Sequence, residues 1–122
     1  MNQARRRLGD FGERVAAAHL EAKGYRILAR NYRCREGEID LVAQQGDVLV
    51  FVEVRARRGE GAGTAAESVT QVKAGRLVAA AQAYYQEHPR LPPHQRIDVV
   101  AVNLSPQGRL QEVEHIEGAV QA

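Results

Sequence analysis

Two short segments of alternating apolar and polar residues, joined by a turn, constrain the fold of this chain more than any other feature. The first is residues 38–43 (EIDLVA), the second is residues 49–55 (LVFVEVR), and Gln44-Gln45-Gly46-Asp47 lies between them. An alternation of period two and a high content of β-branched residues predict strands. Gly46-Asp47 suits a tight turn. We therefore expect the two segments to form an antiparallel hairpin.

The expected hairpin has one apolar face and one mixed face, because side chains alternate along a strand. The apolar face would carry Ile39, Leu41, Ala43, Val50, Val52 and Val54. The mixed face would carry Glu38, Asp40, Val42, Phe51, Glu53 and Arg55. If the turn centres on Gly46-Asp47, Asp40 lies opposite Glu53. The same register sets Glu38 opposite Arg55.

Opposed carboxylates favour a bound cation. Residues directly opposite in a hairpin have Cβ atoms about 4.5–5.5 Å apart, where like charges destabilise the sheet. Mg²⁺ would remove that repulsion, because it binds oxygen ligands and is usually held by one or two carboxylates plus water and substrate phosphate. The expected ligands are Asp40, Glu53 and the carbonyl of Val54, with Mn²⁺ as a substitute metal.

A simpler interpretation needs no metal. Polar alternation is the ordinary signature of a half-exposed sheet, so Glu38 and Arg55 could form a solvent-side ion pair while the other two acids face water. Val42 and Phe51 argue against it, because they lie on the same face and predict that it is partly covered. Charges within such strands are costly unless they are paired or bound to metal. Both interpretations stay open at this stage.

The remaining segments predict an α/β fold in the order α-β-β-β-α-β-β. A helix is expected from near Asp10 to Gly24, then a strand over residues 25–30 and a polar loop over 31–37. A second helix is expected from Ser68 or Thr70 to Glu87, then strands over residues 97–102 and 113–116. The expected architecture is one domain over residues 1–122, a mixed β-sheet flanked by helices. It would carry a basic N-terminal arm (1–8) and a flexible Gly-rich loop (56–66).

Composition narrows the classes of protein. The chain has 122 residues, enough for one domain, and Cys34 is its single cysteine, which excludes an internal disulfide and a multi-cysteine zinc site. It has no apolar run of the roughly 20 residues that a membrane helix needs, and no secretory signal. We therefore expect a cytoplasmic protein that does not enter the membrane.

Arginine dominates the cations, and most of them lie in the first half of the chain. Fifteen of the 17 cations are arginine, and residues 1–58 carry 12 cations against 8 acids. Because the guanidinium fork fits phosphate, this bias is compatible with a nucleic-acid partner. A genome-wide coding bias towards arginine would produce the same composition, so the bias alone does not decide.

A family resemblance adds to these observations. The stretch GERVAAAHLEAKGYRILARNYRCREGEIDLVAQQGDVLVFVEVRAR resembles the YraN family of small bacterial proteins, as do ESVTQVKAGRLVAAAQAYY, RIDVVAV and HIEGAV further on. The resemblance extends from Gly9 to Val120. That family is similar to the Holliday-junction-resolvase branch of the PD-(D/E)XK, restriction-endonuclease-like nucleases. The resemblance implies a restriction-endonuclease-like fold and Mg²⁺-dependent cleavage of phosphodiester bonds in DNA, including branched DNA.

The resemblance also assigns roles to residues. Asp40 matches the motif aspartate and Glu53 the motif acid, while Arg55 stands where these nucleases usually have lysine. Arginine supplies the charge but does not give up a proton, which puts activity in doubt. Lys73, on the second helix, is a candidate substitute, although it could equally be an exposed helix lysine. Glu13 matches an acid that such nucleases often add near the metal.

Several residues have a structural explanation beside the functional one. Asp10 and Glu13 have the spacing of a capping box at a helix start. Arg96 and Asp98 match the R-x-D-V element of the family, and an intrachain ion-pair network explains them at least as well as DNA contact. His115 is interpreted as a packed or surface histidine.

Two functions from different classes follow. The first is a metal-dependent DNA endonuclease with Glu13, Asp40, Glu53, Arg55 and Lys73 as its catalytic residues. Backbone phosphates would be bound by four arginines that flank the hairpin: Arg33, Arg35, Arg57 and Arg58. A branched substrate has two scissile strands, so a homodimer is expected by analogy. The alternative is a catalytically weak or inactive nucleic-acid-binding module that keeps the nuclease fold.

Overall fold

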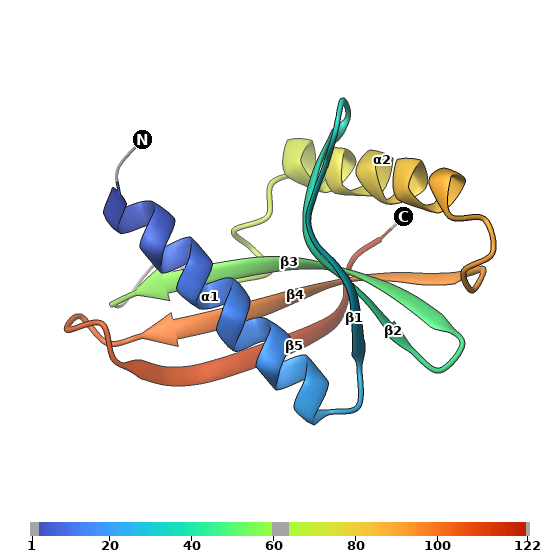
Figure 1. The fold of residues 1–122 in the computed structure, drawn as a ribbon. Helices are drawn as coiled ribbons and strands as arrows, with labels where there is room; N and C mark the ends of the chain where they lie inside the picture. The colour runs from blue at the N-terminus through green and yellow to red at the C-terminus, as the bar shows by residue number, and fades with distance from the viewer. Residues whose placement is uncertain (1–2, 60–63, 122) are drawn as a thin grey trace.

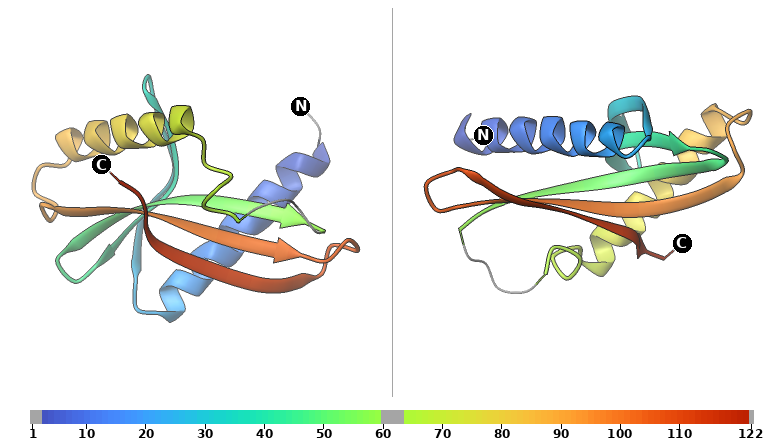
Figure 2. Two further views of the ribbon diagram at one scale, coloured as in Figure 1. Left: turned by 180° about the vertical axis from the view of Figure 1, so that it is seen from behind. Right: turned by 90° about the horizontal axis from the view of Figure 1, so that it is seen from below.

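A five-stranded mixed sheet with one helix on each face forms the protein (Figures 1 and 2). The computed structural model describes residues 3–59 and 64–121. Its elements are α1 (Gln3–Ala22), β1 (Arg26–Cys34), β2 (Gly37–Gln45), β3 (Val48–Arg58), α2 (Gln71–Glu87), β4 (His94–Leu104) and β5 (Leu110–Val120). The expected order α-β-β-β-α-β-β and the mixed sheet are confirmed.

The strands lie in sequence order across the sheet, from β1 to β5. Only β3 and β4 pair in parallel, and the other neighbours are antiparallel. A parallel pair needs a crossover connection, and α2 lies in that connection on the face opposite α1 (Figure 2). Thr70 caps α2 by accepting a hydrogen bond from the Lys73 backbone N–H, so this predicted start is confirmed.

Each helix covers its own apolar cluster. On one face Ala16, Ala17 and Leu20 of α1 pack over a row of strand residues that contains Leu41, Ala43, Val50 and Val52. On the other face, α2 packs over a cluster that contains Ile39, Val42 and Phe51. The predicted alternation therefore holds for most of the hairpin. It is wrong for Ile39, which packs with the α2 cluster because the residues of β2 before Leu41 are not paired with β3 and follow β1 towards α2.

The ends of several elements differ from expectation. The first helix begins at Gln3 rather than near Asp10, so residues 3–8 are helical and not an arm. Leu8 and Phe11 pack against the α1 cluster, which holds the extra turns on the sheet. The polar segment expected to be a loop continues β1 to Cys34, because its backbone pairs with β2 down to Gly37.

The expected Gly-rich loop is shorter at its start. Residues 56–58 belong to β3 and pair with β4, and Ala65 is fully buried. Residues 60–63, the middle of the expected loop, lie outside the described residues. The last strand is longer than predicted, since pairing with β4 extends it well beyond residues 113–116.

Candidate active site

A notch opens in the sheet where β2 separates from β3. The two strands pair from Gln45–Val48 to Leu41–Val52, in the predicted register, and no further. Beyond Leu41, β2 stays paired with β1 and runs towards α2, where Gly37 lies against the backbone of Arg76. β3 continues along β4 instead. Figure 1 shows the β1–β2 tip rising away from β3 beside the first turns of α2.

Asp40 and Glu53 lie together at this notch. The Oδ2 atom of Asp40 accepts a hydrogen bond of 2.8 Å from the backbone N–H of Val54. Glu53 is only 4% exposed. Burial, the negative charge of Glu53 and a hydrogen bond between the two carboxyl groups raise the pKa of Asp40 well above its usual range. The hairpin therefore brings two acids into contact in a poorly solvated place.

Two cations reach Glu53 from different elements. The Nζ atom of Lys73, in the first turn of α2, lies 2.6 Å from Oε2 of Glu53. The guanidinium of Arg55 lies 3.6 Å from the same oxygen, and its Nε donates to the hydroxyl of Ser68. Lys73 is therefore the closer cation to the acid pair.

The expected pairing of Glu38 with Arg55 is wrong. Glu38 forms an ion pair of 3.3 Å with Arg33 on the neighbouring strand β1, where the two side chains are both well exposed. The reason is that β2 and β3 are no longer paired at the level of Glu38. Glu38 is still paired with Arg33 of β1, and its side chain binds that residue.

Glu13 lines the same hollow from α1. This hollow has a volume of about 180 Å³ and is lined by Gly9, Glu13, Glu38, Asp40, Glu53, Val54, Ala56 and Lys73. Burial and the charges of Asp10 and Glu38 raise the pKa of Glu13, although a hydrogen bond with Asn31 opposes them. The capping-box explanation of Glu13 is wrong, because α1 begins at Gln3 and the residue lies in mid-helix.

The donor set suits a hard divalent cation held by few protein ligands. Asp40 and Glu53 supply two adjoining carboxylates, and the backbone carbonyl of Val54 faces the same side of β3 as its N–H, towards the notch. In the described part of the chain, no three acidic, histidine or cysteine side chains converge into a metal cluster. The residues therefore fit Mg²⁺, which keeps several waters, better than a metal that needs a full protein cage.

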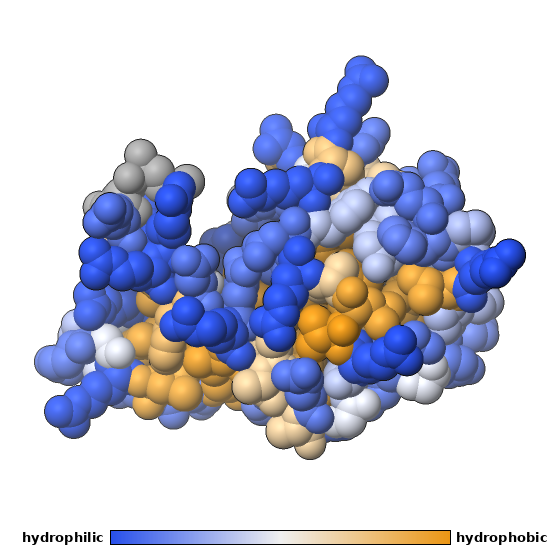
Figure 3. All heavy atoms as spheres, viewed as in Figure 1, coloured by the Kyte–Doolittle hydropathy of each residue, from blue (hydrophilic) through white to orange (hydrophobic). Residues whose placement is uncertain are grey.

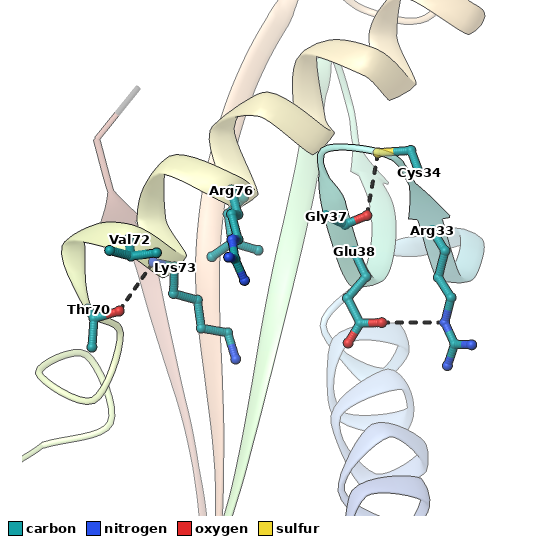
Figure 4. Close-up of a pocket in the computed structure, with 9 residues that line it drawn as sticks. Arg33, Cys34, Gly37, Glu38, Thr70, Val72, Lys73 and Arg76 are labelled. Atoms are coloured by element: carbon teal, nitrogen blue, oxygen red, sulfur yellow. Dashed lines mark hydrogen bonds and ion pairs between the residues drawn. The ribbon is translucent and has the colours of Figure 1, made fainter.

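The four arginines expected to flank the site do not converge. Arg33 and Arg35 lie at the β1–β2 tip, while Arg57 and Arg58 lie at the other end, on the last residues of β3. Sequence reasoning missed Arg76. It lines a hollow of about 510 Å³ beside the acids, between α2 and the β1–β2 tip (Figure 4). Its spacing of three residues from Lys73 was the available signal, because that spacing shares a helix face.

A second polar cluster lies away from the notch. Asp98 is fully buried and receives hydrogen bonds from Arg96, His115 and the backbone of Gly118. Arg96 also donates to the hydroxyl of Tyr25. The ion-pair explanation of Arg96 and Asp98 is therefore confirmed. The His115 side chain is 2% exposed, which makes it a packed residue.

Comparison with known proteins places the chain in a family. The model described as "Uncharacterised protein family UPF0102" matches residues 12–102. The chain belongs to the UPF0102 family. A UPF0102 protein of Pelotomaculum thermopropionicum is 51% identical over 119 residues, covering 98% of this chain and 99% of the relative. Another, from Roseiflexus castenholzii, is 49% identical over 123 residues, covering 99% of this chain and 98% of the relative.

The part of this UPF0102 chain that matches the family model contains the whole acid hollow apart from Gly9. His115 and Gly118, which complete the second polar cluster, lie beyond the matched segment. No helix among residues 3–59 and 64–121 is long and apolar enough to span a membrane.

The acid pair predicts an unusual pH dependence of stability in the UPF0102 chain. A carboxyl whose pKa is raised on folding holds its proton more tightly in the folded state, so its contribution is lost as pH rises from the unfolded pKa through the folded one. In EDTA, the melting temperature should therefore fall as pH rises from 5 to 9. Asp40→Asn should flatten this fall and raise the melting temperature at pH 8 by roughly 3–6 °C, about 1 kcal/mol.

Thermal unfolding followed by circular dichroism gives the melting temperatures of the wild type and of Asp40→Asn. Mg²⁺ should raise the melting temperature of the wild type at pH 8 and leave Asp40→Asn nearly unchanged. Parallel pH curves for the two proteins would show that the Asp40 carboxyl is not the source of the dependence.

Proposed function

We propose that the protein is a metal-dependent DNA endonuclease that hydrolyses phosphodiester bonds, including those of branched DNA. The observation that carries this proposal is the contact of Asp40 with Glu53 in the notch, with the Lys73 ammonium 2.6 Å from Glu53. A carboxyl with a raised pKa, held against a second buried carboxyl group, is costly for stability. Such perturbed groups cluster at functional sites.

The chain's own residues divide the chemical work. Asp40, Glu53 and the Val54 carbonyl would hold Mg²⁺ or Mn²⁺. When bound, the metal supplies a lowered pKa for water and charge neutralisation at the scissile phosphate. Glu13, in the wall of the hollow, would accept a proton or orient water, and burial raises its pKa.

Lys73 is the better candidate for stabilising charge that develops on the phosphate. Its amine lies closer to the acid pair than the guanidinium of Arg55, which is also engaged by Ser68. Arg55 occupies the sequence position of the usual lysine, but Lys73 brings its ammonium to the acids from α2. A preorganised cation of this kind acts in the transition state without having to reorganise.

The proposed DNA substrate also implies which partners the protein binds and where it acts. The arginines at the β1–β2 tip and at the end of β3 are exposed or half-buried, as phosphate contacts require. Cleavage of both strands of a branched substrate would use a homodimer. The DNA substrate implies a cytoplasmic location.

A cleavage assay tests the function. Supercoiled plasmid, linear duplex and four-way-junction DNA are incubated with the protein in Mg²⁺, in Mn²⁺ and in EDTA. We expect nicking in either metal, none in EDTA, and none with Asp40→Asn or Glu53→Gln. Nicking that survives both substitutions would assign the activity to a contaminant or to other residues and would remove this proposal.

The second candidate is a nucleic-acid-binding module without catalysis. Arg55 at the position of the motif lysine favours it, because arginine has a wider head and keeps its proton. Salt-dependent DNA binding without metal-dependent nicking on any of the three substrates would support this module instead of the nuclease.

A further inference from the structure

The acid hollow is the middle section of a longer trough. On one side it shares Glu38 and Lys73 with the hollow of about 510 Å³ beside α2. On the other side it shares Gly9, Val54 and Ala56 with a hollow of about 360 Å³. The three hollows follow one another along the surface from α2 to the N-terminal half of α1, with the acids in the middle one.

Cations line both arms of the trough, and acids line its middle. The arm beside α2 carries Arg33, Lys73 and Arg76. The arm beside the N-terminal half of α1 carries Arg5 and Arg55. Figure 4 shows Lys73 and Arg76 pointing from α2 towards the side where Glu38 and Arg33 lie. Figure 3 shows a hydrophilic hollow in the surface between the N-terminal end of α1 and the α2 side of the molecule.

Gly9 lies where the trough passes α1. It lines both the acid hollow and the next hollow along, and a Cβ atom added there would meet nothing within 4 Å. Glycine weakens a helix interior relative to alanine. At Gly12 packing requires it, because a Cβ would lie 2.8 Å from that of Ala56. No such contact requires Gly9, so the open space above it is available to a ligand.

We propose that one phosphodiester strand lies along the whole trough and passes α1 at Gly9, with the bond to be cut over Asp40 and Glu53. This inference rests on the proposed function and adds the path of the substrate. Guanidinium groups on both arms bind backbone phosphates on both sides of the scissile bond. A channel with a cationic arm on each side of the acids suits cleavage within a strand rather than removal of end nucleotides. The strand comes from single-stranded DNA or from one strand of a duplex.

Binding to the Asp40→Asn protein in EDTA tests the path without cleavage. Fluorescence anisotropy measures a labelled 20-nucleotide single strand and a 20-base-pair duplex over a range of salt concentrations. Gly9→Met should weaken binding of at least one probe at least tenfold. The matched control is Gly75→Met, a helix glycine whose added Cβ would also meet nothing within 4 Å and that lines none of the three hollows. We expect it to stay within twofold of the parent.

The arms are tested separately. Arg76→Ala and Arg5→Ala should each weaken binding and each reduce the slope of log affinity against log salt by about one. Circular dichroism confirms that each variant is folded. The probe that responds to Gly9→Met identifies the source of the strand.

Some results would overturn the path. Equal effects of Gly9→Met and Gly75→Met on both probes would show that no strand passes α1 there. If Arg76→Ala weakens DNA binding and Arg5→Ala does not, the ligand occupies only one arm, and a strand along the whole trough is excluded. If the variants behave as expected but the wild type never cleaves DNA, the proposed strand path is supported and the proposed nuclease activity is rejected. If cleavage is metal-dependent but insensitive to Gly9, the function stands and this path fails.

Discussion

Asp98→Ala is expected to lower the free energy of unfolding by about 3–5 kcal/mol, because it leaves buried polar partners without their acceptor. The Arg96 guanidinium binds both carboxylate oxygens, at 2.8 and 3.0 Å, and His115 binds one of them at 2.7 Å. Lys23 lies 2.7 Å from the Nδ1 atom of His115. Since an ammonium only donates, Nδ1 accepts and Nε2 donates to Asp98.

Urea unfolding followed by circular dichroism measures this loss. Glu117→Gln is the matched control, because Glu117 pairs with the same Arg96 at 3.1 Å but its side chain is 55% exposed. Exposed ion pairs contribute about 1 kcal/mol or less, so this variant should stay close to the wild type. A loss below about 1 kcal/mol for Asp98→Ala, by the same scale, would show that water replaces the missing carboxylate.

The same cluster predicts a pH dependence opposite to that of the notch. Burial alone would raise the pKa of Asp98, but hydrogen bonds from His115, Arg96 and the Gly118 backbone outweigh it and lower the pKa. The stability that this carboxylate contributes is therefore present above its unfolded pKa and lost as pH falls. Asp98→Asn should lose that acid-side dependence.

Lys73→Ala is expected to slow metal-dependent cleavage by about 10²–10³-fold, the usual loss when one preorganised charge-stabilising donor is removed. Arg55→Ala should cost less, because its guanidinium lies 3.6 Å from Glu53, against 2.6 Å for the Lys73 amine. Single-turnover cleavage of the most reactive DNA form measures both. Lys73→Arg should recover part of the rate, since it returns the charge with a wider head.

Binding in EDTA separates catalysis from affinity. In the proposed complex Lys73 would make one of several phosphate contacts, so its loss should change binding far less than cleavage. The opposite ranking, in which Arg55→Ala abolishes cleavage and Lys73→Ala leaves it intact, would assign the charge-stabilising role to Arg55 and contradict the geometry.

Much of the candidate site could be predicted from the sequence, because the contacts of a hairpin join residues that are close in the chain. The turn at Gly46-Asp47 and the period-two alternation set the register of Gln45 with Val48. That register alone predicts that Asp40 lies near Glu53, whatever the other elements do. Thr70 likewise marks the start of α2 through a hydrogen bond three residues away. Interactions over such short sequence separations depend little on the rest of the fold.

Other parts of the site were decided only by tertiary packing. The separation of β2 from β3 before Leu41 places Ile39 on the α2 face and makes Arg33, rather than Arg55, the partner of Glu38. The early start of α1 depends on the packing of Leu8 and Phe11 on the sheet. No capping motif in the sequence predicts it. These outcomes depend on contacts between segments whose spacing in sequence carries no information about their distance in space.

The sequence by itself determined the element order, the hairpin register and the meeting of two acids, because alternation, turn chemistry and capping act between near neighbours. Only the tertiary structure decided that Lys73 reaches Glu53, that Glu13 faces the acids, and that Gly9 lies on a trough with cations on both arms. Those relations arise because α1 and α2 pack on opposite faces of one sheet and both line the acid hollow at the notch between β2 and β3. Such packing is a property of the whole core.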